Sequence, residues 1–125
     1  MPRSSPRSAG ATYLDKAERI VQLKAAARRA AERLCTVCRV VLFGSFVSGI
    51  PTPRSDADLL VVVETSPHLQ PRDRVPEVLR ALGPLPCPID LFVVTDEELR
   101  RLSREGDTLV RLALETGQEL LQPEA

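Results

Sequence analysis

The chain has 125 residues, with 17 basic and 17 acidic side chains, so its formal net charge is zero. This length suits one domain with one core, and the neutral balance argues against a general attraction to nucleic acid. Aromatic residues make up only 3% of the chain, too few for the stacking platforms that bind single-stranded nucleic acid.

The beginning of the chain divides into a tail and a helix. Residues 1–10 are rich in proline, serine, arginine and glycine, and we expect them to be a disordered tail. Residues 11–122 are then expected to form one domain. Thr12 has the chemistry of a helix N-cap, and apolar residues recur at helical spacing from Leu14 to Leu34. The pattern predicts an amphipathic helix over 12–34.

Two strands are predicted next. Residues 39–43 are mostly β-branched and apolar, and Gly44 ends the run. Residues 46–49 are a candidate for a short helix, and the prolines and serine of 51–55 mark a loop. Residues 58–64 are almost uninterrupted in apolar character, which is typical of a strand buried on both faces.

The second half of the chain alternates between helices and strands. A helix is predicted over 75–82, followed by a rigid connection over 83–88 that contains three prolines. Residues 89–94 form the third predicted strand, and Thr95 with Glu98 predicts a capping box at the start of another helix. Gly106 interrupts that helix, a last helix ends at Gly117, and residues 118–121 are a candidate edge strand.

Three carboxylates stand at the starts of predicted strands. Asp56 and Asp58 are two residues apart, so their side chains point the same way if both are extended. Asp90 lies between Ile89 and Leu91 in the third strand. Charges this close to buried strands are costly unless a cation neutralises them. Carboxylate oxygens are ligands that Mg²⁺ prefers, and three of them permit a site for two ions.

The Gly44-Ser45 turn supplies features that suit a phosphate. Glycine allows a phosphate to approach the backbone closely, and amides at the start of a helix attract anions. The Ser45 hydroxyl can donate one more hydrogen bond. We therefore expect the turn to hold a nucleotide triphosphate while the aspartates hold the metal ions.

The positions of these residues constrain the sheet. Gly44 ends the first strand, whereas Asp58 and Asp90 begin the second and third. They meet only if the first strand is antiparallel to the second and the third is parallel to it. The predicted fold is therefore α/β, with a small mixed sheet and helices on at least one face.

Gly44-Ser45, ten residues, and then Asp56-x-Asp58 resembles the motif of the DNA polymerase β-like nucleotidyltransferase superfamily, with Asp90 as its third carboxylate. The short chain is similar to the minimal nucleotidyltransferases. The resemblance implies ATP as substrate, Mg²⁺, and metal binding by all three aspartates. Many members are antitoxins paired with a HEPN-domain ribonuclease toxin, and some transfer AMP to a toxin tyrosine. We accordingly expect adenylyl transfer to a hydroxyl, with Asp90 orienting or deprotonating it.

The chain departs from the motif in one place. Members often carry an arginine-containing segment after Gly-Ser, but here that segment is Phe46-Val47-Ser48-Gly49 and contains no base. Arg54 is the candidate to replace a phosphate contact. Two alternatives stay open: an antitoxin that neutralises its partner by contact alone, and a transferase that acts on a small molecule.

Other features give weaker expectations. The chain has no apolar run long enough for a membrane span and no signal-peptide pattern at its start, so a cytoplasmic location is expected. A homodimer is compatible with the sequence. Cys35, Cys38, Cys87 and His68 invite a zinc interpretation, but the predicted topology places Cys38 and Cys87 at opposite ends of the sheet.

Overall fold

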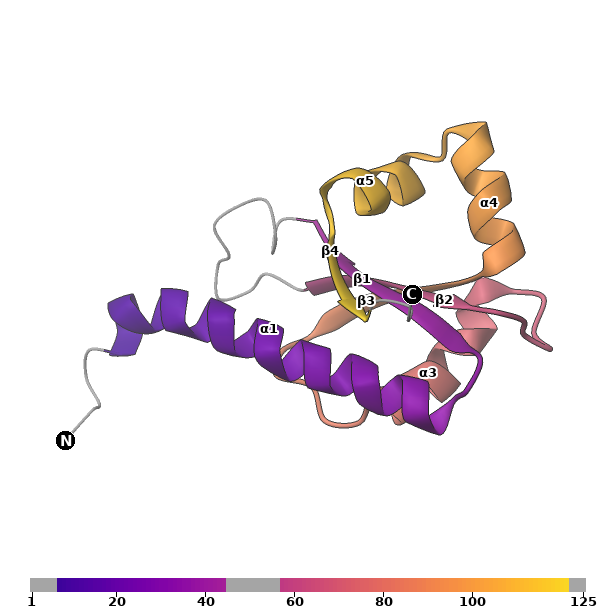
Figure 1. Cartoon of the computed structure of the whole chain (residues 1–125). Coiled ribbons are helices and arrows are strands. Elements are labelled where there is room, and N and C mark those ends of the chain that lie inside the picture. The colour runs from indigo at the N-terminus through magenta and orange to yellow at the C-terminus, as the bar shows by residue number, and fades with distance from the viewer. Residues whose placement is uncertain (1–6, 45–56, 122–125) are drawn as a thin grey trace.

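The computed structural model describes residues 7–44 and 57–121, with side chains from residue 17 onward in the first range. In chain order the elements are α1 (Arg7–Arg33), β1 (Val37–Phe43), β2 (Ala57–Val63), the short 3-10 helix η1 (Pro71–Arg74), α3 (Val75–Leu82), β3 (Ile89–Thr95), α4 (Asp96–Glu105), α5 (Thr108–Thr116) and β4 (Gln118–Leu121) (Figure 1). Within these ranges no helix combines the length and the apolar character needed to cross a membrane.

The strands form one mixed sheet in the order β3-β2-β1-β4. β1 is antiparallel to β2 and to β4, whereas β2 and β3 are parallel. This arrangement confirms the strand directions predicted from the positions of Gly44, Asp58 and Asp90. β4 is the short edge strand expected over 118–121, and β3 forms the other edge.

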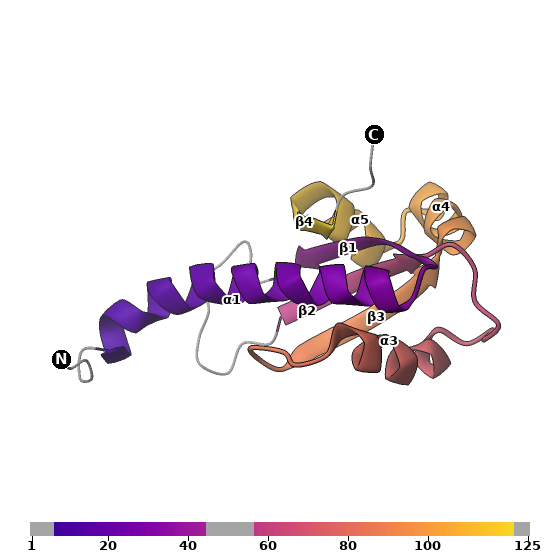
Figure 2. The same cartoon turned by 60° about the horizontal axis from the view of Figure 1, so that its bottom comes forward.

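Helices cover both faces of the sheet. α1 and α3 lie on one face and α4 and α5 on the other, so the sheet is the middle of three layers (Figures 1 and 2). Alternating strand residues fill two separate apolar clusters, as expected for strands buried on both sides. The cluster beneath α1 and α3 includes Leu23, Leu59 and Leu82. The cluster beneath α4 and α5 includes Leu60, Leu99 and Val110.

Two predicted boundaries at the start of the chain are wrong. Helix α1 begins at Arg7, so Thr12 lies inside it and is not its N-cap, and the last four residues of the predicted tail are helical. Ala9 and Ala11 have high helix propensity, and one internal glycine costs only about 1 kcal/mol. β1 begins at Val37, two residues earlier than predicted, because Val37 still pairs with Val63 of β2. The N-terminal part of α1 extends past the sheet (Figure 2).

The predicted helix boundaries in the second half are confirmed. The Thr95 side chain accepts a hydrogen bond from Glu98 N (3.1 Å), and Glu98 Oε1 accepts one from Thr95 N (3.0 Å), which completes the capping box of α4. Gly106 ends α4 with a φ of +77°. Asp107 then caps α5 by accepting a hydrogen bond from Val110 N (3.0 Å).

Candidate functional site

Two of the three predicted carboxylates lie side by side. Asp58 of β2 is in register with Asp90 of β3, so their α-carbons are neighbours across a parallel pair, roughly 4.8 Å apart by strand spacing. Residues in register point to the same face of a sheet. Asp58 is half-buried and Asp90 is exposed. Like charges at directly opposed positions destabilise a sheet, so this pair favours a cationic ligand.

Gly44 lies against the Asp58 carboxylate. Phe43, the last residue of β1, is in register with Asp58, which brings the following glycine to the same end of the sheet. A β-carbon built on Gly44 would lie 2.2 Å from Asp58 Oδ2, and the φ of Gly44 is +88°. Only glycine fits here without strain or displacement of the carboxylate. The end of β1 and the starts of β2 and β3 therefore meet, as the sequence predicts.

The remaining predicted site residues are Ser45, Arg54 and Asp56, and they lie outside the described residues. Within 7–44 and 57–121 there is no group of three or more histidine, cysteine, aspartate or glutamate side chains that could hold a metal ion. The described part of the site thus consists of Asp58, Asp90 and the backbone at Gly44.

The two neighbouring carboxylates, Asp58 and Asp90, fit the requirements of Mg²⁺. This ion takes oxygen ligands and is usually held by one or two carboxylates together with phosphate oxygens and water. The side chains that could hold it among the described residues are Asp58 and Asp90. Because Gly44 carries no side chain, the Asp58 carboxylate lies directly against its backbone.

An aromatic pair borders the carboxylates on the same face of the sheet. Phe43 is in register with Asp58, and Phe92 follows Asp90 by two residues, so all four side chains share the face that α4 and α5 cover. The Phe43 and Phe92 ring centroids are 6.1 Å apart. Phe43 is buried, but Phe92 is 36% exposed. Phe92 thus presents an apolar surface directly next to Asp90.

Arg29 of α1 holds in place the connection over 83–88, which leads into β3 and Asp90. Its Nε donates to Leu82 O and its Nη2 to Pro84 O, both at 2.8 Å. A β-carbon at Gly83, whose φ is +76°, would lie 2.8 Å from Arg29 Nε. Farther along this connection, Pro88 O accepts a hydrogen bond from Ala57 N (3.1 Å). The Arg29 side chain therefore faces α3 and the connection that follows it.

A buried ion pair fixes the opposite end of β3. Arg74 is 4% exposed and makes a two-pronged contact with Glu98, at 2.7 Å to Oε1 and 3.0 Å to Oε2. Arg74 also donates to His68 O (2.9 Å) and Val93 O (3.2 Å). The hydrogen bond from Arg74 lowers the pKa of Glu98, and the Thr95 backbone amide acts in the same direction, although burial opposes both.

Sequence reasoning missed Arg74. It occurs in the run Arg72-Asp73-Arg74, where its neighbours are exposed, and nothing in the run distinguishes it. Glu98 offered the available signal. It is part of a capping box that directly follows a strand, and this position holds its carboxylate within reach of a basic partner.

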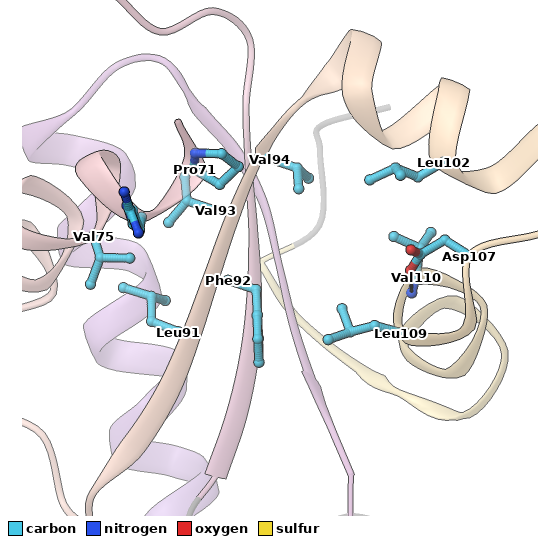
Figure 3. A pocket seen from close by; sticks show the side chains of 11 residues that line it. Pro71, Val75, Leu91, Phe92, Val93, Val94, Leu102, Asp107, Leu109 and Val110 are labelled. Atoms are coloured by element: carbon cyan, nitrogen blue, oxygen red, sulfur yellow. Dashed lines mark hydrogen bonds between the residues drawn. The ribbon is translucent and has the colours of Figure 1, made fainter. Parts of the chain in front are cut away.

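A groove of about 440 Å³ runs along β3. Figure 3 shows Val75 and Leu91 on one side of the strand and Leu102 and Leu109 on the other. The other lining residues are Pro71, Arg72, Phe92, Val93, Val94, Asp107 and Val110, so the walls are almost wholly apolar. Phe92 belongs to both the groove and the surroundings of Asp90, and the two features are therefore continuous.

The cysteines do not gather at the site. Cys38 packs against the cluster beneath α4 and α5, and its Sγ lies 3.4 Å from Val62 O, whereas Cys87 packs against the cluster on the other face. Burial, together with the negative charges of Asp96 and Glu64, raises the pKa of the Cys38 thiol. A neutral, partly buried thiol is typical of a packing role.

Residues 23–87, more than half of the chain, match the model of the nucleotidyltransferase domain family. The chain belongs to this family. The match spans Gly44, both members of the Asp56-x-Asp58 pair and the two strands that bring Gly44 and Asp58 together. This nucleotidyltransferase has no match among curated proteins.

Two crystal structures share the fold of this nucleotidyltransferase. One is a proposed nucleotidyltransferase from Sulfolobus solfataricus, with a TM-score of 0.59 and 21% identity over 81% of this chain and 84% of the other. The second is a toxin–antitoxin structure with AMP-PNP, with a TM-score of 0.50 and 19% identity over 81% of this chain and 74% of the other. At these identities the likeness concerns the fold, and it agrees with the α/β mixed sheet described above.

Proposed function

We propose that this nucleotidyltransferase moves AMP from Mg-ATP to a hydroxyl group. The observation that carries the proposal is the register of Asp58 with Asp90, combined with the contact between Asp58 and the Gly44 backbone. Two carboxylates and a glycine turn at one end of a mixed sheet provide oxygen ligands beside a surface where a phosphate can approach. The family match supports the same chemistry.

In this proposal each residue has a distinct role. Asp56 and Asp58 hold two Mg²⁺ ions, and Asp90 holds one of them. Gly44 and Ser45 bind the triphosphate through the backbone and a hydroxyl, and Arg54 adds a phosphate contact. When bound, Mg²⁺ neutralises the charge that develops on the phosphate oxygens.

We assign Asp90 to the acceptor because it is exposed and lies on the edge strand. The acceptor oxygen forms a bond to the α-phosphorus, the bond from that phosphorus to the β-phosphate oxygen breaks, and pyrophosphate leaves. Asp90 orients the hydroxyl and accepts its proton, which then passes to solvent.

We further propose that the acceptor is on a protein partner and that the pair is a toxin–antitoxin system, with a HEPN-domain toxin as the partner. The fold neighbour from a toxin–antitoxin structure with AMP-PNP supports this assignment. The described elements form one side of a site, which is lined by carboxylates, and they include no second lobe that could enclose an acceptor. A partner that brings its own hydroxyl completes such a site.

A second candidate is an antitoxin that neutralises its partner by contact alone. The segment Phe46-Val47-Ser48-Gly49, which contains no base after the Gly-Ser turn, favours this alternative. The two candidates differ in whether the carboxylates matter. If contact suffices, Asp58→Asn still neutralises the toxin in cells that produce both proteins. If adenylyl transfer is required, the same variant fails to protect them.

The first test is a calorimetric titration of Mg-ATP into the wild type, Asp58→Asn and Asp96→Asn. Asp96 is a control carboxylate at the start of α4, beyond the far end of β3. We expect metal-dependent binding in the wild type and the control and its loss in Asp58→Asn. Equal binding by all three proteins would overturn the proposed nucleotide site.

A further inference from the structure

The edge strand β3 exposes its backbone over only part of its length. Backbone groups alternate between the two sides of a strand. Pro88 O accepts from Ala57 N, so the even-numbered residues that follow turn their N–H and C=O groups toward β2. The odd-numbered residues Ile89, Leu91, Val93 and Thr95 turn theirs outward.

The outward groups at the far end of β3 are occupied. Val93 O accepts from Arg74 Nη1 (3.2 Å), and Thr95 N donates to Glu98 Oε1 (3.0 Å). The buried Arg74–Glu98 pair therefore closes this half of the edge. It leaves no room there for another strand to pair.

The near half of the edge is open. Among the described residues, no hydrogen bond reaches the outward N–H and C=O groups of Ile89 and Leu91. Apart from the charge of Asp90, β3 contains none of the charged residues, prolines or bulges that usually protect a sheet edge from pairing. The open groups flank Asp90 in sequence, so the unprotected edge coincides with the candidate acceptor position.

The groove continues from this open edge. Asp90, Phe92 and Val94 lie on the same face of β3. On this face the groove begins at Phe92 and is bounded by Leu109 of α5. An extended chain paired with Ile89 and Leu91 would place one side chain at Asp90. Its next side chain on the same face, two residues away, would lie over the apolar groove. Free backbone groups with an apolar groove beside them fit a polypeptide strand.

We propose that the acceptor is an extended polypeptide segment that adds to the open half of the β3 edge. It pairs antiparallel with Ile89 and Leu91, presents a hydroxyl side chain to Asp90 and seats an apolar side chain, two residues away, against Phe92 and Leu109. This inference rests on the proposed adenylyl transfer and specifies its substrate class. The hydroxyl oxygen becomes bonded to the AMP phosphorus, pyrophosphate leaves, and the hydroxyl proton passes to Asp90.

The probe is the peptide acetyl-Val-Gln-Tyr-Gln-Val-amide, which places an apolar residue two positions from the hydroxyl in either direction. With tyrosine opposite Asp90 in an antiparallel pair, the two glutamine amides face β3 and the tyrosine amide faces away. We therefore compare the unmodified peptide with one N-methylated at both glutamines and one N-methylated at tyrosine. Mass spectrometry follows AMP transfer from Mg-ATP to each peptide by the full-length protein.

We expect methylation of the glutamine amides to lower the transfer rate by about tenfold or more, since it removes hydrogen bonds to the edge. Methylation at tyrosine leaves the rate within about twofold, since that amide makes no bond to β3. Equal rates for all three peptides would overturn pairing with the edge. No transfer to any peptide by a protein that still binds Mg-ATP would overturn the polypeptide acceptor. Loss of Mg-ATP binding itself would instead count against the proposed function.

A matched pair of protein variants tests the groove. Leu109→Asp places a charge in the groove wall, whereas Leu112→Asp alters a residue of the same helix that is 43% exposed and does not line the groove. We expect a raised KM for the peptide in Leu109→Asp alone, with Mg-ATP binding unchanged in both variants. If sedimentation shows a dimer that Leu109→Asp dissociates, a second copy occupies the edge and the proposal is wrong.

Discussion

Gly44, directly after β1, lies against the Asp58 carboxylate of the neighbouring strand β2. Gly44 adopts a φ of +88°, and the position that its β-carbon would take lies 2.2 Å from Asp58 Oδ2. The glycine thus serves two purposes, since it tolerates the left-handed φ after β1 and leaves room for the Asp58 carboxylate beside its backbone. A substitution at this position affects both the backbone and the carboxylate.

Gly44→Ala is expected to abolish Mg-ATP binding because the new methyl group displaces Asp58. The backbone strain alone is expected to lower the free energy of unfolding by about 1–2 kcal/mol. Gly106→Ala is the matched control, since Gly106 also has a left-handed φ, +77°, but its nearest neighbour, Arg111 Nη2, is 3.7 Å from the added β-carbon. Calorimetry and urea denaturation of both variants separate the two effects. Retained binding in Gly44→Ala would show that Asp58 does not need this space.

The strand directions and the meeting of Gly44, Asp58 and Asp90 could be predicted from the sequence because each residue stands at a strand end. Because these residues must meet, the end at which each one lies fixes the direction of its strand. The apolar runs of β2 and β3 also identify these segments clearly as strands. The start of α1 could not be predicted, since Thr12 has N-cap chemistry but the residues before it are also compatible with a helix.

The roles of two arginines also escaped prediction from sequence. Arg29 and Arg74 donate to backbone carbonyls of segments that are distant in sequence or irregular, namely Pro84 O and His68 O. Helical periodicity identifies which face of a helix is apolar, but it does not show whether a long polar side chain reaches a neighbouring loop. Such contacts depend on tertiary packing, which the local sequence does not encode.

Asp90→Asn and Asp58→Asn are expected to differ in their effects. Asp58 lies against Gly44, at the proposed triphosphate site, so its variant is expected to lose Mg-ATP binding. Asp90 is on the exposed edge strand, so its variant retains most of the binding but loses transfer by about 10²–10⁴-fold, the usual contribution of a general base. Titration calorimetry and a pyrophosphate-release assay distinguish the two outcomes. Equal loss of binding in both variants would contradict the acceptor role of Asp90.

Arg74→Met is expected to lower the free energy of unfolding by about 3–5 kcal/mol, because it leaves Glu98 without its partner and the carbonyls of His68 and Val93 without donors. Arg72→Met, at an exposed neighbour, is expected to change it by no more than about 0.5 kcal/mol. Denaturant unfolding monitored by circular dichroism measures both values. Similar stabilities for the two variants would show that the buried pair contributes little.

The Arg74–Glu98 ion pair makes the free energy of unfolding depend on pH. Because Arg74 lowers the pKa of Glu98 in the folded protein, the unfolded chain binds its proton first as the pH falls below about 4.3, the ordinary value for glutamate. The contribution of Glu98 is complete above this pH and is lost as the pH falls through its folded pKa. For Glu98→Gln, the free energy of unfolding is expected to fall less steeply than in the wild type as the pH drops from about 5 to 3. An unchanged slope would assign the acid sensitivity to other carboxylates.

Arg29→Lys is expected to loosen the connection that leads into Asp90. The guanidinium bonds Leu82 O and Pro84 O at the same time, which a single ammonium group on a flexible stem does not reproduce. We expect a loss of about 1–2 kcal/mol in the free energy of unfolding and faster hydrogen exchange over 83–88. AMP transfer should fall while Mg-ATP binding persists, because the position of Asp58 depends on the pairing of β2 with β1. Arg28→Lys, at the exposed neighbouring position, is the control and should change none of these quantities. If both variants behave alike, the prolines of the connection are rigid enough to position Asp90 without help from α1.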